Sequence, residues 1–479
     1  MIKTEFKAHP IMILRLMKPY LFVLILPLLR ALVQYVTNGE INGLLALELI
    51  AFAFIVVMAI LGWRAISITV NDRYITVKKG VFLKSCAVIE VSRISSISLE
   101  QNILDYILRS VDCYVNTEAG RPNKSDFNLK MYKNDAKLLF KNIYGEEAQN
   151  VIKFSAYRIA LLAATTSSAV TGIIISVPII NKTSDLIGVA ISDMLFNEIN
   201  NVSSHFNSIF PPIVNILTII LLIAYGLAFF VSFFKNVNFK LKSSENGIEV
   251  QSGIIVRKRV MFKKSKVNDV CFEQTPLMRI LKIYSMKASI GGYGDNKGRR
   301  AVVVPVAKHK ELEEQLDKHF PYLQPDGNTI APKQTGRNIK RFLYIPAILA
   351  LIIIGAGAVA TILFPYFDRL VLFLAAVLLG IDVYYASICY RNYKYGELRL
   401  GEYILASGSS GFTVRELYCD KSKIGVIKIS QTPADRQFAT CKVKLTVRSE
   451  NADSVRVKNI DLKTVNKSLN ETFKLNIDE

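Results

Sequence analysis

The densest group of side chains that could bind an anion is a basic stretch in the middle of the chain. Val256, Val260 and Phe262 alternate there as in a strand, which leaves much of the charge on the opposite face. That face would suit anionic lipid headgroups, for which each Lys or Arg near the surface contributes about 1 kcal/mol. The alternative is a solvated strand face in a basic protein. The cations are Arg257, Lys258, Arg259, Lys263, Lys264 and Lys266.

A glycine-rich segment from Gly291 to Arg300 resembles a phosphate-binding loop in composition alone. Its spacing is G-x-G-x-x-x-G, which is neither the dinucleotide-binding nor the Walker form, and a strand pattern follows it in place of a helix. We therefore expect a hairpin tip, at which Arg299 and Arg300 remain candidates for contact with phosphate.

Residues typical of metal or nucleophilic chemistry are scattered. No cysteine belongs to a C-x-x-C pair, and the four histidines are far apart in sequence, so we expect no metal site and no cofactor. We also find no nucleophile–base arrangement, and we expect a protein that is not an enzyme. The residues are Cys86, Cys113, Cys271, Cys389, Cys419, Cys441, His9, His205, His309 and His319.

Two charges, Arg30 and Glu48, interrupt apolar stretches at similar distances from the connector near Glu40. Charges inside a membrane are costly and tend to pair. We expect an Arg30–Glu48 ion pair or a contact with another subunit. The alternative is that both side chains lie close enough to the outer interface to reach water.

The elements that must position these residues are apolar stretches of membrane length. A formal charge of +21 beside an apolar fraction of 51% fits a chain that separates apolar spans from charged domains. A spanning helix needs about 20 apolar residues. We expect six spans in three hairpins, and the first lacks the small-residue site of a cleaved signal. The stretches are 19–37 and 44–63, 157–180 and 211–234, and 341–364 and 367–389.

The distribution of Lys and Arg predicts the orientation of these spans. The connectors within the pairs contain almost none, whereas the opposite flanks are rich in both. Positive charge near helix ends stays cytoplasmic, so both termini and the intervening domains should be inside the cell. The long second connector, 181–210, has an apolar pattern that predicts either an amphipathic helix on the outer surface or an ordered loop.

After each apolar pair, the same landmarks recur. Alternating strands lead to a glycine (Gly80, Gly253 and Gly408) that we expect to supply the positive φ of a tight turn. A glutamine motif follows after 21, 21 and 23 residues, and then another strand and a closing helix. Such recurrence predicts repeated small β-barrels or sandwiches, each capped by a helix.

The glutamine motif varies in a way that sets its first copy apart. It reads QNILDY from Gln101, QTPLMR from Gln274 and QTPADR from Gln431. The first copy therefore lacks both the Thr-Pro pair and the final arginine. A hydrogen bond that fixes the turn is one expectation for that arginine, and binding of a partner is the other. The residues singled out are Gln101, Gln274, Pro276, Arg279, Gln431, Pro433 and Arg436.

These motifs, with the Asn-Asp-Arg-Tyr-Ile run at 71–75, resemble those of the bacterial pleckstrin-homology-like (PH-like) membrane proteins, also called membrane-flanked domain proteins. The three-copy arrangement is similar to the larger, YdbT-like members. The resemblance implies a PH-like barrel and a bacterial plasma-membrane location. It also implies a smaller partner with two helices and one PH-like domain, and it implies no known reaction.

The expected fold is thus an α+β membrane protein with six transmembrane helices in three hairpins. They alternate with three PH-like β-barrel domains, each closed by a C-terminal helix. We refer to those domains as segments 1, 2 and 3. The boundaries are 1–64 (hairpin 1), 65–154 (segment 1), 155–235 (hairpin 2), 236–325 (segment 2), 326–339 (linker), 340–391 (hairpin 3) and 392–479 (segment 3).

Two functions from different classes remain open at this point. One is a non-enzymatic scaffold that assembles a membrane complex through its three cytoplasmic domains. The other is a component of envelope defence that binds anionic phospholipids or handles lipid or amphipathic peptides. A basic charge is also typical of proteins that bind nucleic acid, but in a protein with several spans anionic lipid explains it more simply.

Overall fold

The computed structural model contains two compact units, which are described separately. Unit 1 comprises Met1–Ile152, Lys240–Lys266 and Ile290–Arg299, and unit 2 comprises Lys153–Phe239, Val267–Ser289 and Arg300–Glu479. The structure describes residues 4–20, 43–117, 126–144, 150–174, 191–204, 212–245, 247–290, 300–448 and 454–474.

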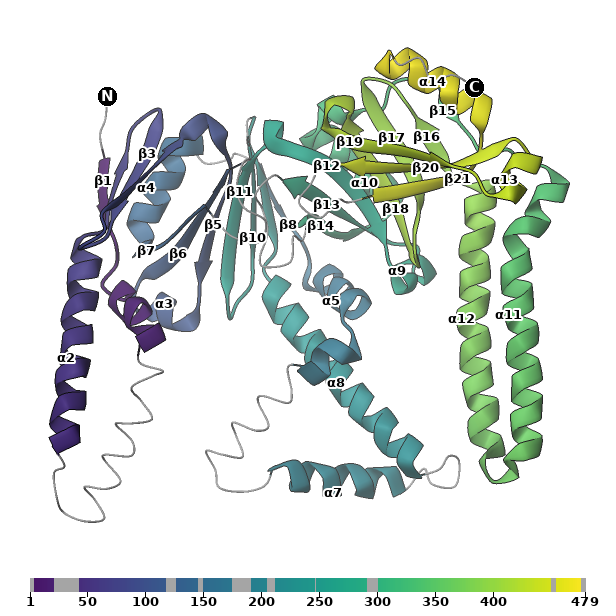
Figure 1. Ribbon diagram of the computed structural model, residues 1–479, viewed down its shortest axis with the longest axis horizontal. Helices are drawn as coiled ribbons and strands as arrows, with labels where there is room; N and C mark the ends of the chain where they lie inside the picture. The colour runs from purple at the N-terminus through teal and green to yellow at the C-terminus, as the bar shows by residue number, and fades with distance from the viewer. Residues whose placement is uncertain are drawn as a thin grey trace. The chain divides into compact units, whose positions relative to one another are not determined.

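Unit 1 is built on two antiparallel sheets with the orders β1-β2-β3-β4 and β7-β6-β5-β11-β10-β9-β8 (Figure 1). The bounds are β1 (Thr4–Lys7), α2 (Gly43–Arg64), β2 (Ser67–Val70), β3 (Tyr74–Lys79), β4 (Ser85–Glu90), β5 (Ile94–Gln101), α3 (Ile103–Ile107), β6 (Ser110–Thr117), β7 (Phe127–Tyr132), α4 (Lys133–Tyr144), β8 (Asn150–Lys153), β9 (Lys240–Ser243), β10 (Gly247–Ser252) and β11 (Arg257–Lys263).

The core of unit 1 forms where segment 1 folds onto itself. Ile68 and Val77 from the first sheet pack with Ile97 and Met131 from the second, and all four are buried. Helix α4 covers this core with Leu139 and its neighbours, which follow the helical period. Alternation within the strands thus buries one face of each sheet against the other.

Unit 2 contains the sheets β14-β13-β12-β18-β17-β16-β15 and β19-β20-β21. The strand bounds are β12 (Val267–Gln274), β13 (Tyr284–Ile290), β14 (Ala301–Ala307), β15 (Thr329–Ile330), β16 (Glu397–Arg399), β17 (Tyr403–Ser410), β18 (Thr413–Asp420), β19 (Ile424–Ser430), β20 (Thr440–Val447) and β21 (Ser454–Asp461).

The helices of unit 2 include both short caps and long apolar segments. Helix α14 covers segment 3 through Val465 and Leu469, which join the buried residues of β16 to β21 in one core. The bounds are α5 (Ala156–Thr166), α7 (Ile191–Ser204), α8 (Pro212–Asn236), α9 (Pro276–Ile280), α10 (His309–His319), α11 (Gly336–Leu363), α12 (Asp368–Lys394), α13 (Pro433–Gln437) and α14 (Leu462–Phe473).

The sheets are open and shared between segments, so the prediction of closed barrels is wrong. Strand β5 of segment 1 pairs with β11 of segment 2, and β12 of segment 2 pairs with β18 of segment 3. The reason is a three-residue 3-10 turn after β4, β11 and β18 (Val91–Arg93, Lys264–Lys266 and Lys421–Lys423), after which the chain enters a different sheet. The strand edge that would close a barrel is instead used by the neighbouring segment.

Two of the three predicted turn glycines have the expected conformation. Gly80 and Gly253 have φ values of 107° and 94°. The third prediction is wrong, because Gly408 lies within β17 and the positive φ belongs to Gly411. Gly408 serves another need, since a Cβ there would lie 2.1 Å from the carbonyl oxygen of Arg456.

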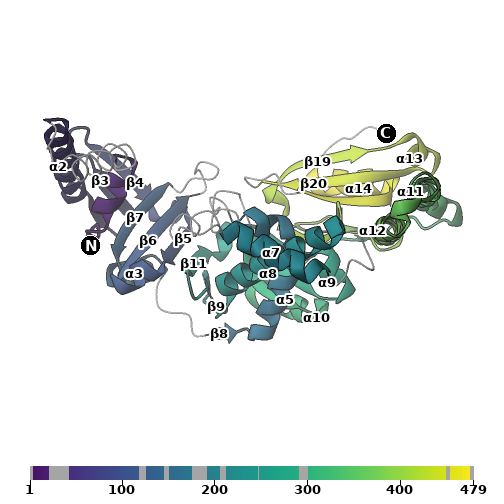
Figure 2. The same ribbon diagram turned by 90° about the horizontal axis from the view of Figure 1, so that it is seen from below.

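The prediction of six spanning helices in three hairpins is also wrong for the described residues. Three helical segments are long and apolar enough to cross a membrane: Val214–Asn236, Asn338–Leu363 and Pro365–Lys394. The last two lie in α11 and α12, which pack side by side as a hairpin (Figure 2). The apolar part of α2 found among the described residues, Leu49–Arg64, is shorter, and most of the stretch 19–37 lies outside them.

The apolar stretch 157–180 is interrupted for a local reason. Helix α5 ends at Thr166, and Ser167 adopts an extended conformation with φ −74° and ψ 152°. The hydroxyls of Thr165 and Thr166 donate to carbonyls one turn back, a pattern that competes with regular helix. In the long connector, the predicted helix is present as α7, while its place on a membrane surface stays a prediction.

Candidate functional site

The glutamine of the repeated motif closes a turn in the same way in all three segments. Each side-chain amide donates to a carbonyl nine residues further along: Gln101 to Ser110 at 3.0 Å, Gln274 to Ile283 at 3.2 Å and Gln431 to Thr440 at 2.8 Å. The bond ties the end of one strand to the start of the next. The glutamine therefore has a structural role that holds the short helix between those strands.

The residues after the glutamine begin that short helix. Thr275 and Thr432 accept from the third backbone amide of α9 and α13, and Pro276 and Pro433 occupy the first helical position, where no amide hydrogen is needed. Asn102 takes the capping place in segment 1 and forms a capping box with Asp105. Segment 1 lacks the Thr-Pro pair, but the capping box of Asn102 and Asp105 preserves the turn.

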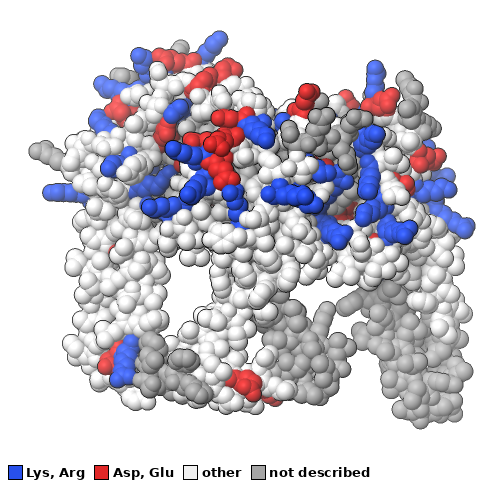
Figure 3. Space-filling view, turned by 180° about the vertical axis from the view of Figure 1, so that it is seen from behind, with Lys and Arg blue, Asp and Glu red and all other residues white. Residues whose placement is uncertain are grey.

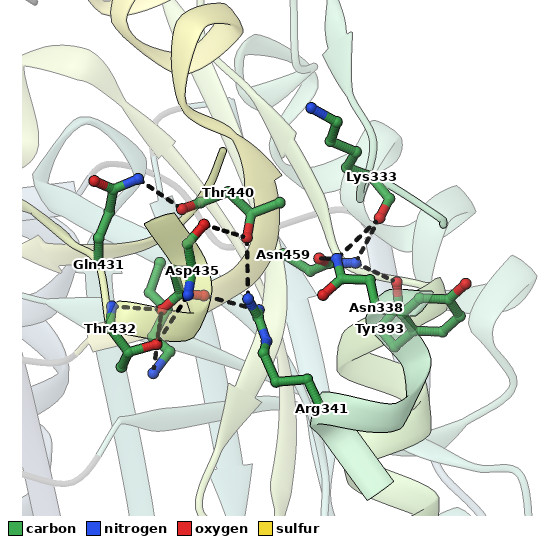
Figure 4. Close-up of polar contacts among 10 residues, drawn as sticks. Lys333, Asn338, Arg341, Tyr393, Gln431, Thr432, Asp435, Thr440 and Asn459 are labelled. Atoms are coloured by element: carbon green, nitrogen blue, oxygen red, sulfur yellow. Dashed lines mark hydrogen bonds and ion pairs between the residues drawn. The ribbon is translucent and has the colours of Figure 1, made fainter. Parts of the chain in front are cut away.

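In segment 3, this turn holds the start of the hairpin formed by α11 and α12 (Figure 4). Asp435 of α13 is fully buried, and its carboxylate lies 2.8 Å from the guanidinium of Arg341 in α11. The same guanidinium donates to the Thr440 hydroxyl at 3.2 Å. Removal of either partner would leave the other charge buried and unpaired, which makes this contact structurally demanding.

A second polar contact joins both helices of that hairpin to β21 (Figure 4). Asn338 of α11 donates to the side-chain oxygen of Asn459 at 2.5 Å. The amide of Asn459 donates to the Tyr393 carbonyl of α12 at 3.1 Å and to the Lys333 carbonyl at 3.0 Å. One buried side chain in the β-sheet therefore binds the linker and both helices together.

In segment 2, the equivalent turn meets its membrane-side helix through apolar contact. Met278 replaces the buried aspartate and packs with Leu162 of α5, while the Thr275 hydroxyl donates to the Thr165 carbonyl at 3.2 Å. Arg279 reaches in another direction, to α12. Its guanidinium donates to the Ser387 carbonyl at 3.1 Å and lies 5.7 Å from the centre of the Tyr384 ring.

In segment 1, a lysine neutralises the buried aspartate of the turn. Lys130 lies 2.5 Å from Asp105 and 2.9 Å from Asp112. Burial opposes ionisation of Asp105, but hydrogen bonds from Lys130 and Ser110 outweigh it and hold the pKa below its ordinary value. Arg15, from the helical residues 12–20, lies 3.0 Å from Asp112.

The strongest candidate for anion binding is a pair of arginines at the base of α12. Arg391 donates to the Ser407 hydroxyl at 3.1 Å and lies 3.7 Å from Glu416. One terminal nitrogen of Arg391 and one of Arg279 are buried and have no hydrogen-bond partner among the described residues. Burial and then Glu416 raise the pKa of Tyr284, and Arg391 and Arg279 oppose that rise, so both arginines act on one small region.

His309 occupies the other side of Glu416. Its Nε2 lies 2.7 Å from a carboxylate oxygen of Glu416, and this hydrogen bond raises the pKa of His309 above its ordinary value. Tyr284 packs edge-on against the imidazole, with 5.2 Å between ring centres. Sequence reasoning missed this cluster, because its members come from β13, α10, α12 and β18 and share no sequence pattern.

The basic stretch is an inner strand, β11, and its cations have partners within unit 1. Lys263 donates to the Val91 carbonyl at 2.9 Å, and burial lowers the pKa of Lys263 and of Lys264. Lys264 and Lys266 lie in the 3-10 turn after β11. Lipid contact by this group stays a prediction. The remaining contacts are Arg257 over the Tyr106 ring at 4.5 Å, Lys258 with Glu100 at 2.9 Å and Arg259 with Glu249 at 2.6 Å.

The other sequence-based candidates are dispersed. Arg300 is buried and lies 3.0 Å from Asp269, which places it within the fold of unit 2. Arg436 is exposed on α13. The glycine segment with Arg299 lies outside the described residues, as does Arg30, and of the predicted Arg30–Glu48 pair only the backbone of Glu48, in α2, is described.

Comparison with known proteins adds one positive result. A family model described as a bacterial PH domain matches residues 20–147 and 189–319, which together make up just over half of the chain. A search of curated protein sequences finds no match.

Proposed function

The chain belongs to the bacterial PH domain family, and on this premise we propose that it is a non-enzymatic scaffold of a membrane complex. Three apolar helices support association with a membrane. The PH-like segments would hold these helices, and the proteins bound to them, in a fixed order. Its partners would include the smaller two-helix PH-like membrane protein that the resemblance implies.

The observation that carries this proposal is the direct attachment of apolar helices to the motif turns. Arg341 and Asn338 fix the start of α11 to segment 3, and Thr275 and Met278 fix α5 to segment 2. Shared sheets then join the segments to one another within each unit. These ion pairs, hydrogen bonds and apolar contacts resist movement of a helix relative to its segment. Such rigidity suits a scaffold better than a transporter, whose helices must rearrange.

The state of the cysteines favours a non-catalytic role. Burial raises the pKa of Cys113 to about 12 and that of Cys271 to about 11, and it raises the pKa of Cys441 to about 12. A nucleophilic cysteine needs a thiolate in a partly exposed, electropositive environment. These three thiols are packing residues of the β cores.

The charge distribution supports a cytoplasmic orientation for the segments. The long apolar helices show little Lys or Arg away from the strands, and these residues gather on the strand-bearing parts of the units (Figure 3). Arg391 and Lys394 lie in the last turn of α12, and Lys235 lies in that of α8, each next to the strands that follow. Positive residues at those ends are typical of the cytoplasmic side.

The scaffold proposal is tested by mild solubilisation of native membranes, tag purification of the intact protein and mass spectrometry of all retained protein and lipid. A membrane protein retained in stoichiometric amount is expected. Arg341→Gln, which releases α11 from Asp435, should reduce that retention, while Lys421→Gln at an exposed pair should not. Purification of the chain without any stoichiometric protein, in several detergents, would contradict a scaffold.

Binding of an anionic lipid headgroup is the second candidate, because Arg279 and Arg391 each bury a terminal nitrogen without a hydrogen-bond partner among the described residues. A phosphate group could accept from both. The same purification would then retain phosphatidylglycerol or cardiolipin selectively over neutral lipid. The variant Arg279→Gln should lose that lipid while retaining protein partners, and equal lipid content in both proteins would remove this candidate.

A further inference from the structure

The two shared sheets are joined in the same register. Counted back from the 3-10 turn, Lys258 and Arg415 occupy the same position, and counted back from the motif glutamine, Glu100 and Glu273 do so too. In the structure Glu100 pairs with Lys258 across β5 and β11, and Glu273 pairs with Arg415 across β12 and β18. Both pairs are ion pairs, at 2.9 and 3.1 Å. The two joints between segments therefore have the same strand register and the same kind of ion pair.

Among the described residues, the same pattern of joints leaves one strand in each unit without the partner that the joint supplies elsewhere. Strand β4 is equivalent to β11 and β18, but it lies at the end of its sheet, and within the described parts of the chain it pairs with β3 alone. Strand β19 is equivalent to β5 and β12, and it too lies at the end of its sheet, next to β20 (Figure 2). Both edges expose apolar side chains, including Val88 at 60% and Val426 at 57%. Exposed apolar edges are ready to pair with another strand.

We propose that β19 of one copy of this protein pairs with β4 of a second copy, so that copies associate head to tail. We assume that β19 and β4 pair in the same register as the two internal joints. Ser430 then lies opposite Ser85, Ile429 opposite Cys86 and Ile427 opposite Val88. The apolar residues of the two edges thus face one another across the new pairing. The inference deepens the scaffold proposal and rests on it, by naming a second copy as a partner.

The residues at the open ends match each other and differ from those of the internal joints. Both internal joints have glutamate opposite a basic residue, whereas both open ends have serine at that position, Ser430 and Ser85. A foreign strand that presented Lys or Arg to Ser430 would gain no ion pair. Two serines opposite one another form a compatible hydrogen-bonding pair, which favours this chain as its own partner.

The joint between β12 and β18 includes a second contact, and the proposed joint between two copies has equivalent residues for it. Arg279, in the turn after β12, binds Ser387 and Tyr384 of α12, the helix that precedes β16 to β18. The equivalent arginine after β19 is Arg436, which is exposed. The helix that precedes β2 to β4 is α2, and Phe54 stands there at the same distance from the following strand as Tyr384, 13 residues. Phe54 is 64% exposed, so Arg436 of one copy and Phe54 of the next form a second, separate pair.

Such a joint is heterologous, since two different surfaces meet. An open assembly keeps one β4 edge and one β19 edge free at its ends, whereas a closed ring keeps neither. Heterologous contacts produce rings if the rotation closes and open chains if it does not. Membrane helices would thereby be arranged in a row or ring larger than one chain provides.

The test uses the only exposed cysteine among the six, Cys86, which lies on β4. The variant Ile429→Cys is expressed as the full chain, and membranes are treated with a short bismaleimide before denaturing electrophoresis. We expect a ladder of covalent dimers and higher species. The wild-type protein and the double variant Ile429→Cys/Cys86→Ser should give none. Lys428→Cys, whose side chain leaves β19 on the opposite face, should give severalfold less.

Charge substitutions at Ser85 and Ser430 test whether the cross-link depends on the pairing of β19 with β4. In the Ile429→Cys background, Ser85→Glu with Ser430→Glu should reduce the ladder severalfold, and Ser85→Lys with Ser430→Glu should restore it. A cross-link confined to the monomer, an equal ladder from Lys428→Cys, or no ladder despite a reactive cysteine at 429 would each overturn the pairing. In the last case, a different protein retained on purification would leave the scaffold proposal standing.

Discussion

Arg341 at the start of α11 lies 2.8 Å from Asp435, the buried aspartate of the motif turn in segment 3. This pair shows what the repeated motif does in that segment. Asp435 also accepts hydrogen bonds from the backbone and hydroxyl of Thr432, at 2.7 and 2.6 Å, so one carboxylate shapes the turn and holds the helix. The motif of segment 3 is thus an attachment point for α11.

Loss of this carboxylate should therefore be costly. We predict that Asp435→Asn lowers the free energy of unfolding by about 3–5 kcal/mol, because the Arg341 guanidinium would remain half-buried without its counter-charge. Thermal unfolding of the purified protein in detergent measures the effect. Lys421→Gln, at an exposed pair with Glu402, is the control and should leave the unfolding temperature unchanged. Equal effects in both variants would contradict the role assigned to Asp435.

Glu273 provides a pH-dependent prediction at an internal joint. Burial opposes its ionisation, but Lys287 and then Arg415 outweigh burial and hold the pKa of Glu273 below its ordinary value. Because the folded pKa is depressed, its contribution to stability is present above the unfolded pKa of about 4.3 and is lost as the pH falls. Glu273→Gln should flatten the decline of the unfolding temperature below that pH. An unchanged pH profile would show that the joint does not depend on this charge.

His309 should titrate above its ordinary range. The hydrogen bond with Glu416 raises its pKa, so the stability it contributes is present at low pH and is lost as the pH rises through the folded pKa. Glu416→Gln should lower the pKa of His309, as measured by NMR titration of the imidazole signals. His9, whose pKa is lowered by burial, serves as the control and should not respond. No change at His309 would contradict the assigned hydrogen bond.

Two glycines make a matched test of helix packing in unit 2. A Cβ at Gly172 would lie 1.7 Å from the carbonyl oxygen of Ala224 in α8, whereas a Cβ at Gly226 would meet nothing within 4 Å. Gly172 belongs to the helical residues 169–174, and Gly172→Ala should push them away from α8 and lower the unfolding temperature by several degrees. Gly226→Ala should leave it unchanged or raise it slightly, because alanine is the better helix former. The opposite order of effects would contradict this helix contact.

Much of the local structure could be predicted from the sequence. The strands expected after the motif are present as β6, β13 and β20, and the closing helices are present as α4, α10 and α14. These predictions rest on short-range signals, namely alternation, helical period and capping residues. The Thr-Pro pairs at Pro276 and Pro433 marked helix starts for the same reason.

Pairing between strands of different segments could not be predicted in this way. Alternation shows which face of a strand is buried, but it does not show which edge finds which partner. The expectation of closed barrels failed at that step, and β11 was treated as a solvent-facing basic strand when it lies between β5 and β10. Arg279 was singled out by its motif, but the cluster of Arg391, His309 and Glu416 was missed because only tertiary packing brings it together.

The central claim is that sheets continue from one segment into the next. It is tested most directly by a cysteine at Glu100 and another at Lys258, which face each other across β5 and β11, in a chain where Cys86 is replaced by serine. Disulfide formation between residues 100 and 258 within one chain, identified by mass spectrometry of linked peptides, is the predicted result. Ser252, which lies opposite Lys258 on β10 and is therefore one strand further away, is the matched control and should not link to residue 100. Two reactive cysteines at 100 and 258 that never form the link would contradict the account.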